Sequence, residues 1–152
     1  MRLGVIPAPG SGLGSMDKTG QLERLYVHLG HYAGAFDLRY FSGLPWWEEA
    51  PLWHRFEAQC GGELIAEADG VGWRQALVWP LRRPRLFRQC DALRAMNLLG
   101  AIPALTARWA YGIPFVVSHG ADYEAIAAIH GRSRLHLTKW GWLRRLVFRH
   151  AS

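Results

Sequence analysis

The order of apolar and polar positions predicts short strands alternating with longer helices. Short segments typical of strands occur at 3–6, 37–42, 91–97 and 113–118, and the last of them is apolar on both faces, as in a strand covered by helices. Between the first two runs, helical i, i+3, i+4, i+7 spacing is followed by Leu22, Leu25, Tyr26 and Leu29. Strands joined by helices through short connections favour a parallel sheet. We therefore predict an α/β protein, a Rossmann-like parallel sheet with helices on both faces, as a single domain over residues 1–152, with Ile113–Ser118 in the middle of the sheet.

The remaining segments carry weaker patterns. Helices are expected at 100–111, closed by Gly112, at 123–129 and at 139–150. In the last of these, one face is shared by Trp140, Leu143 and Val147. In the 100–111 helix, Trp109 is expected to be available for burial. A short helix around 52–56 should end near Gly61, and two short strands are predicted at 64–66 and 76–79.

A glycine-rich loop follows the first predicted strand. The chain runs from Pro7 to Ser15 before the first helix, and its candidate ligand-binding residues are Gly10, Ser11, Gly12, Leu13, Gly14 and Ser15. A strand, a glycine loop and a helix can present backbone N–H groups to a phosphate or a sugar. The loop is neither a Walker A motif nor a full dinucleotide fingerprint, because the required lysine and third glycine are missing. A ligand loop is the favoured interpretation, and a plain tight turn is the alternative.

Polar side chains also follow two later strands. Asn97 ends the strand at 91–97, and His119 and Asp122 follow the strand at 113–118. Ligands of open α/β sheets bind at the carboxyl ends of the strands. We therefore expect Asn97, His119 and Asp122 to line one cleft with the glycine loop. A histidine bonded to a neighbouring carbonyl is the structural alternative for His119. The rim of this cleft is a candidate docking surface formed by Leu13, Trp46 and Trp47.

The net charge of +6 is unevenly placed. All 12 Asp and Glu residues lie at or before Glu124, whereas six of the 18 Lys and Arg residues follow it. Such a basic segment favours phosphate-bearing partners, and an anionic membrane surface is the one we expect. A plain solvated basic face is the alternative. The arginines of 82–88 are interrupted by Pro84 and belong to no recognised nucleic-acid module, so we expect no nucleic-acid partner.

Cysteine and histidine usage limits the chemistry further. Cys60 and Cys90 form no close-spaced motif, and no export signal precedes them, which favours a reducing, cytoplasmic location. No segment approaches the roughly 20 apolar residues of a membrane-spanning helix. His28 and His31 are spaced i, i+3, but two histidines alone make a poor metal site. We expect neither a metal nor a cofactor.

Several motifs together carry a family resemblance. They are Gly12-Leu13-Gly14-Ser15, Cys90–Ala95, Gly100–Leu105, and Tyr111–Val117 followed by Gly120–Glu124. Their order resembles the N-terminal domain of the family 4 retaining glycosyltransferases of the GT-B fold. The resemblance covers nearly the whole chain.

The resemblance implies an acceptor-binding half domain. In such enzymes the C-terminal domain binds the sugar nucleotide, and the glycine loop approaches the donor across the cleft. Many members place a histidine near the position of His119, which implies a catalytic role for that residue. The donor domain would begin about where this sequence ends, so we expect no activity without a donor-binding half. The acceptor could be lipid-linked, and the protein would then lie peripherally on the inner face of the cell membrane. Two alternatives are a non-catalytic binding or scaffold module and a small dinucleotide-binding protein.

Overall fold

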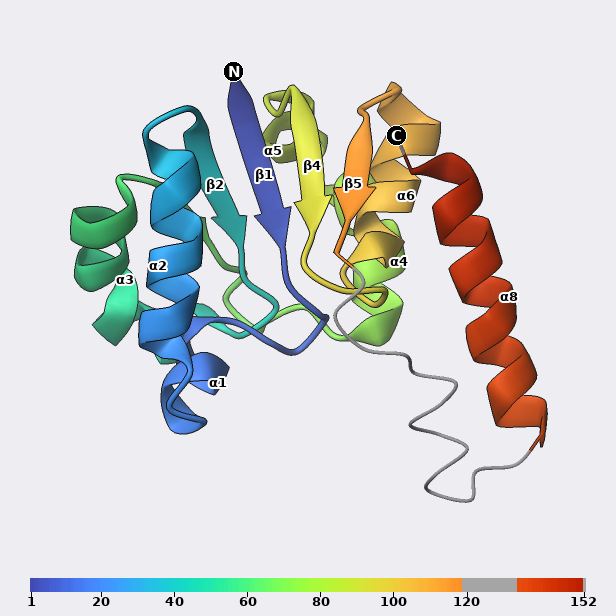
Figure 1. The fold of residues 1–152 in the computed structure, drawn as a ribbon, viewed down its shortest axis with the longest axis horizontal. Helices are drawn as coiled ribbons and strands as arrows, with labels where there is room; N and C mark the ends of the chain where they lie inside the picture. Colours follow the sequence, from blue (N-terminus) through green and yellow to red (C-terminus); the bar gives the residue numbers. More distant parts are fainter. Residues whose placement is uncertain (119–133, 152) are drawn as a thin grey trace.

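The computed structural model of the protein describes residues 1–118 and 134–151, with only the backbone described for 134–137. Its centre is a five-stranded sheet in the order β3-β2-β1-β4-β5 (Figure 1). All four neighbouring pairs of strands run parallel. The strands are β1 (Arg2–Ile6), β2 (Asp37–Phe41), β3 (Glu63–Ile65), β4 (Ala92–Ala95) and β5 (Phe115–Val117). The predicted α/β class and parallel sheet are confirmed.

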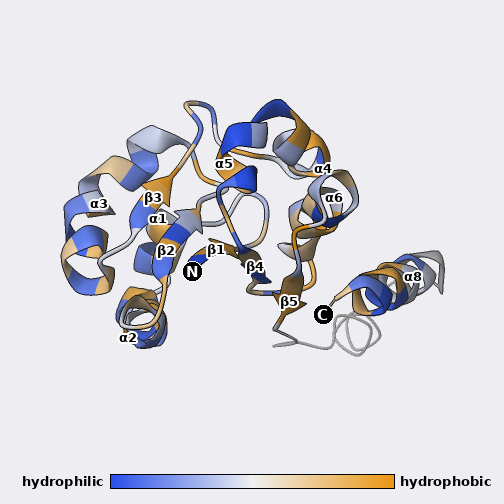
Figure 2. Ribbon diagram, turned by 90° about the horizontal axis from the view of Figure 1, so that it is seen from above, coloured by the Kyte–Doolittle hydropathy of each residue, from blue (hydrophilic) through white to orange (hydrophobic). Residues whose placement is uncertain are grey.

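Helices cover both faces of this sheet (Figure 2). On one face lie α1 (Leu13–Lys18), α2 (Leu22–Ala33) and α3 (Trp46–Cys60). On the other face lie α4 (Trp73–Arg82), α5 (Pro84–Arg88) and α6 (Ala101–Tyr111), and α8 (Arg134–His150) packs against α6. The predicted helix at 123–129 lies outside the described residues.

The strand side chains divide between two hydrophobic cores. The first core joins β1 and β2 to α1–α3 through buried residues such as Val5, Leu13, Leu29, Leu38 and Phe56. The second joins the opposite faces of β2 and β4 to α4–α6, and its buried residues include Phe41, Trp79, Phe87, Leu93 and Ala104. Val147 of α8 belongs to the second core, and Trp140 and Leu143 pack against it. The expected inner face of the last helix is confirmed.

The predicted strand at 76–79 is wrong, because these residues lie inside α4. Its buried residues are Ala76, Trp79 and Pro80, at i, i+3, i+4 spacing. The side chain of Gln75 accepts a hydrogen bond from the Gly72 N–H at 2.7 Å, which stabilises the first turn of the helix. A four-residue apolar run cannot by itself distinguish a strand from the buried stripe of a helix.

Two further expectations need correction. The strand at 113–118 is not central, because β5 is the last strand in the order and Val116 is 46% exposed. Trp109 is not buried, because its side chain is 57% exposed, although its ring centroid lies 5.6 Å from that of His150 in α8. Gly112 closes α6 as predicted, with a left-handed φ of 73°.

Candidate functional site

The connections after β1 and β4 meet at the carboxyl edge of the sheet. A Cβ added to Gly100 would lie 2.5 Å from the carbonyl oxygen of Ile6 and 2.7 Å from that of Pro7. Only a glycine lets the start of α6 approach β1 this closely. Asn97 lies in the same connection, and its Oδ1 accepts a hydrogen bond from the Gly100 N–H at 2.8 Å. The side chain of Asn97 therefore supports the turn that leads into α6.

The glycine-rich loop is shorter than the sequence indicated. It ends at Gly12, and Leu13, Gly14 and Ser15 form the first turn of α1. Ser15 accepts a hydrogen bond from the Gly12 N–H at 3.0 Å and contacts Ser11 through its hydroxyl. Gly10 has a φ of 71° and donates to the carbonyl of Val71 at 3.0 Å. Backbone and side-chain bonds thus hold the whole Gly10–Ser15 segment in place.

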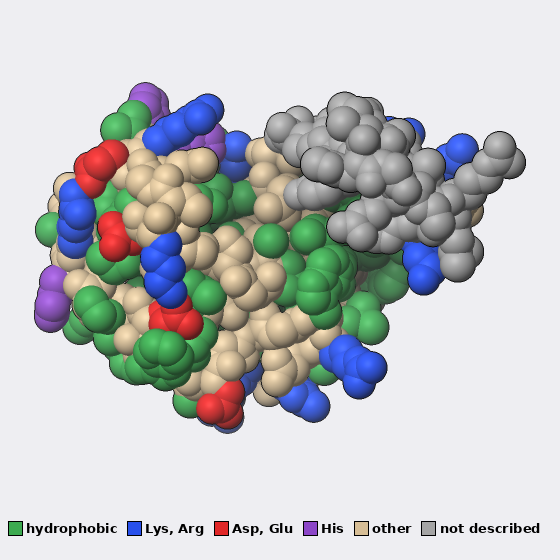
Figure 3. Space-filling view, turned by 90° about the horizontal axis from the view of Figure 1, so that it is seen from below, with side chains coloured by type: hydrophobic (Ala, Val, Ile, Leu, Met, Phe, Trp, Pro, Cys, Tyr) green, Lys and Arg blue, Asp and Glu red, His purple; other side chains and the backbone are tan. Residues whose placement is uncertain are grey.

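The expected rim of hydrophobic residues is only partly present. Leu13 is completely buried in the first core, because the side chain turns inward as α1 begins, so its predicted role in docking is wrong. Trp46 and Trp47 are 40% and 69% exposed. Seen from the carboxyl edge, hydrophobic side chains form several separate patches (Figure 3).

A buried glutamate occupies the backbone donors of this loop. Glu49 of α3 accepts hydrogen bonds from the N–H groups of Leu13 at 3.1 Å and Gly14 at 3.0 Å. It is fully buried, and burial raises the pKa of its carboxyl, while the bonds from Gly14, Leu13 and Ser42 act in the opposite direction. The chain's own carboxylate thus fills the position in which a phosphate would meet these two N–H groups.

The other two predicted site residues are not described. His119 and Asp122 lie outside the described residues, so their positions relative to Gly12 and Asn97 stay predictions. Neither cysteine supplies a nucleophile, because burial raises the pKa of both the Cys60 and Cys90 thiols to about 11. Both are free. Within residues 1–118 and 134–151, no three His, Cys, Asp or Glu side chains gather as metal ligands.

A second concave feature formed by described residues lies elsewhere. A groove of about 720 Å³ runs between α2 and the ends of β4 and β5. In Figure 1, α2 stands in front of β2, whereas no described helix stands in front of β4 and β5. Basic and histidine side chains gather over α2 (Figure 3). The polar lining includes Arg24, His28, His31, Tyr32, Arg94 and Ser118.

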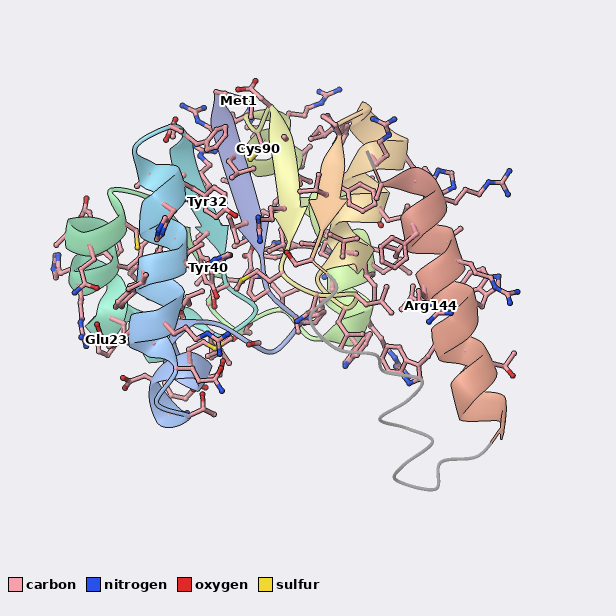
Figure 4. All side chains as sticks on the ribbon, in the orientation of Figure 1. Met1, Glu23, Tyr32, Tyr40, Cys90 and Arg144 are labelled. Atoms are coloured by element: carbon pink, nitrogen blue, oxygen red, sulfur yellow. The ribbon has the colours of Figure 1, made fainter. Side chains whose placement is uncertain are left out.

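Arg94 of β4 is at the centre of this groove. Because side chains alternate along a strand, Arg94 faces α2, whereas Leu93 and Ala95 face the second core. Its guanidinium donates hydrogen bonds to the hydroxyls of Tyr32 and of Ser118, the latter at 2.9 Å. Tyr32 extends from α2 toward the sheet (Figure 4), and its ring lies 4.9 Å from the guanidinium carbon. Side chains of α2 and of the residue that follows β5 therefore converge on one arginine of β4.

His28 is the third partner of Arg94. Its Nε2 lies 3.2 Å from a terminal nitrogen of the guanidinium, which favours the tautomer in which Nε2 accepts. Burial lowers the pKa of His28, and the charges of Arg94, His31 and Arg24 lower it further. The lowered pKa and the contact with the Arg94 guanidinium both favour a neutral His28 ring with Nε2 as the hydrogen-bond acceptor.

Arg39, an arginine of the neighbouring part of the sheet, shows by contrast what is unusual about Arg94. Arg39 of β2 forms an ion pair of 2.8 Å with Glu63, its neighbour across the sheet, and also bonds to Gln89. Each partner of Arg94 among the described residues is neutral. The buried Nε atoms of both arginines lack a hydrogen-bond partner among those residues, so the difference between them is the Glu63 carboxylate, which lies beside Arg39 only. The sequence carried a signal for this site, because Arg94 interrupts a short, otherwise apolar strand.

Comparisons of the chain with protein-family models, curated proteins and solved structures found no match. None of the described helices has the length and the apolar character needed to cross a membrane.

Proposed function

We propose that this chain is the acceptor-binding half of a sugar-nucleotide-dependent retaining glycosyltransferase. The observation that carries the proposal is that the resembling motifs fall on consecutive elements of a parallel sheet. Cys90–Ala95 leads into and forms β4, Gly100–Leu105 begins α6, and Tyr111–Val117 ends α6 and forms β5. Of these elements, β4 supplies Arg94 to the groove and Ser118 directly follows β5, while α6 begins at the carboxyl edge of the sheet. Ligand binding at that edge is the usual arrangement of open α/β sheets.

In this proposal the chain binds and orients an acceptor but does not stabilise the leaving group. Transfer of a glycosyl group requires the acceptor hydroxyl to be held at the anomeric carbon while negative charge develops on the departing diphosphate. The backbone donors best suited to that charge, in Leu13 and Gly14, already bond to Glu49. A separate donor-binding half would have to supply the diphosphate contacts.

The test is a transfer assay with purified chains. The protein would be incubated with labelled sugar nucleotides and with free or lipid-linked acceptors, with and without a candidate donor-binding chain. We expect labelled product only in the mixture. Sustained transfer by the isolated 152 residues would contradict the proposal, and so would the absence of transfer with every donor-binding chain that forms a complex with the protein.

A non-catalytic binding module is the second candidate, and Glu49 is the observation that favours it. A glycine loop closed by an internal carboxylate serves as structure and contributes no donor contacts. The two candidates differ in the complex with a donor-binding chain. Complex formation without any transfer would favour the binding module, whereas turnover would favour the enzyme half.

Membrane association belongs to the same proposal. The outward face of α8 carries the exposed side chains of Lys139, Trp142, Arg145, Phe148 and Arg149. Basic residues are attracted to anionic headgroups, and tryptophan suits the interfacial region. Such a surface would bring the protein to a membrane that contains a lipid-linked acceptor.

A further inference from the structure

The charge of the groove between α2 and β4 is one-sided. Among the described residues that line it, two arginines and two histidines are present, and no aspartate or glutamate. Glu23 of α2 is engaged elsewhere, in an ion pair with Arg55. A partly buried guanidinium without a carboxylate partner is costly unless an anion neutralises it.

The hydroxyls around Arg94 are arranged as further donors. The oxygens of Tyr32 and Ser118 each accept a hydrogen bond from the guanidinium, so each O–H hydrogen is free to point to another acceptor. No acceptor for either hydroxyl is found among the described residues. Together with the remaining N–H groups of Arg94, they form a set of donors that suits an oxyanion.

The volume of the groove also fits a small ligand. At about 720 Å³ it lies within the range of roughly 300–1,000 Å³ that is typical of ligand pockets. Met16, Leu25 and Met96 provide apolar walls beside the basic residues. The groove could therefore hold a phosphate together with a sugar-sized or glycerol-sized group.

We propose that this groove binds the phosphate group of a phosphomonoester, with Arg94 as the central donor and Tyr32, Ser118 and His28 around it. Arg24 of α2 also lines the groove and adds a second positive charge. That the phosphate belongs to a sugar acceptor rests on the function proposed above. The binding site itself does not depend on that function.

Isothermal titration of the full chain tests this site directly. The probes are inorganic phosphate, glucose 6-phosphate, and vesicles of phosphatidylcholine with and without phosphatidic acid, all at one ionic strength. We expect Arg94→Gln to weaken binding of phosphate and of glucose 6-phosphate about tenfold or more, because charge-assisted bonds to phosphate are lost. The matched control is Arg74→Gln on α4, which removes an exposed arginine on the other face of the sheet and should change affinity less than twofold.

Two smaller substitutions keep the test decisive if Arg94→Gln fails to fold. Tyr32→Phe and Ser118→Ala each remove one hydroxyl and leave the arginine in place, and each should weaken binding several-fold. A second readout is the His28 ring, followed by NMR. A bound phosphate should raise the pKa of His28 against the effects of burial and of Arg94, His31 and Arg24.

The outcomes separate the site from the function. Tighter binding of glucose 6-phosphate than of phosphatidic acid vesicles would identify a soluble phosphomonoester, and the reverse order would identify a lipid phosphate; both support the site. If phosphate binding depends on Arg94 but no assembled complex transfers a sugar, the phosphate-binding site would be supported and the proposal that its ligand is a sugar acceptor would be rejected. Absence of binding by all probes, or equal losses in the Arg94 and Arg74 variants, would overturn the site.

Discussion

Glu49 and Arg94 are two ionisable side chains on the side of the sheet that α1, α2 and α3 cover. They differ in their hydrogen-bond partners and in the space around them. Glu49 has two backbone N–H donors and no space beside it, since a Cβ on Gly12 would lie 2.6 Å from its Oε1. Arg94 lies in a groove, with neutral partners. A buried polar group whose hydrogen bonds are satisfied within the chain supports the structure, whereas a partly buried charge without a counter-charge points to a ligand.

Removing the Glu49 carboxylate should destabilise the protein. Glu49→Ala would leave the N–H groups of Leu13 and Gly14 without an acceptor in a buried site. We expect the free energy of unfolding to fall by about 3 kcal/mol, measured by urea denaturation. The control is Glu48→Ala, which breaks an ion pair with the largely exposed Lys18 and should cost less than about 1 kcal/mol. Equal losses in the two variants would contradict this role of Glu49.

Glu49 should also give stability a distinctive pH dependence. Because burial raises its pKa in the folded protein, the folded state holds this proton more tightly than the unfolded chain. The resulting stabilisation is fully present below the unfolded pKa of about 4.5 and is lost as the pH rises through the folded value. The unfolding free energy of the wild type minus that of Glu49→Gln should therefore fall as the pH rises above about 4.5. Denaturation at several pH values checks this, and a difference that grows with pH would contradict it.

At the scale of elements, the junction of β1 with α6 depends on one glycine. Gly100→Ala would push a Cβ against the backbone carbonyls of Ile6 and Pro7, which cannot move without disturbing β1. We expect a loss of about 2 kcal/mol in urea denaturation. Gly34→Ala is the matched control, because its Cβ would meet no atom within 4 Å and its φ of −73° suits alanine. Full stability of Gly100→Ala would show that the junction adapts.

Strands with long apolar runs could be predicted from the sequence, whereas their position in the sheet could not. Val116 is exposed on an edge strand, although the sequence around it has the apolar pattern of a buried strand. The helix at 73–82 was missed because its buried stripe contains a stretch of four apolar residues. The start of α1 was missed because the bonds from Leu13 and Gly14 to Glu49 join residues about 35 positions apart. Contacts of that kind leave no local pattern.

The same limit applied to the candidate site. The glycine loop and Asn97 lie at the carboxyl edge expected from the alternation of strands and helices. The sequence could not show that Glu49 closes the loop, because an adjacent pair of glutamates on a helix usually faces solvent. The groove was also missed, because Arg94, His28 and Ser118 come together only through the tertiary fold.

At the scale of the whole molecule, the basic residues of α8 should direct the protein to anionic membranes. Replacement of Lys139, Arg145 and Arg149 by glutamine should weaken binding to phosphatidylserine vesicles by about 1 kcal/mol per residue at low salt. Vesicle sedimentation measures this. The control replaces the exposed Arg74, Arg82 and Arg85 of α4 and α5, which also removes three charges. Equal binding to neutral and anionic vesicles would remove the electrostatic part of the proposal.

The central claim is that anionic ligands enter the groove at Arg94 and do not enter the glycine loop. The most direct measurement is the set of backbone amide shifts in an NMR titration of the full chain with glucose 6-phosphate. We predict saturable shifts at Arg94, His28 and Ser118, with little change at Leu13 and Gly14, whose N–H groups bond to Glu49. Shifts centred on Leu13 and Gly14, with Arg94 and His28 unmoved, would contradict the claim.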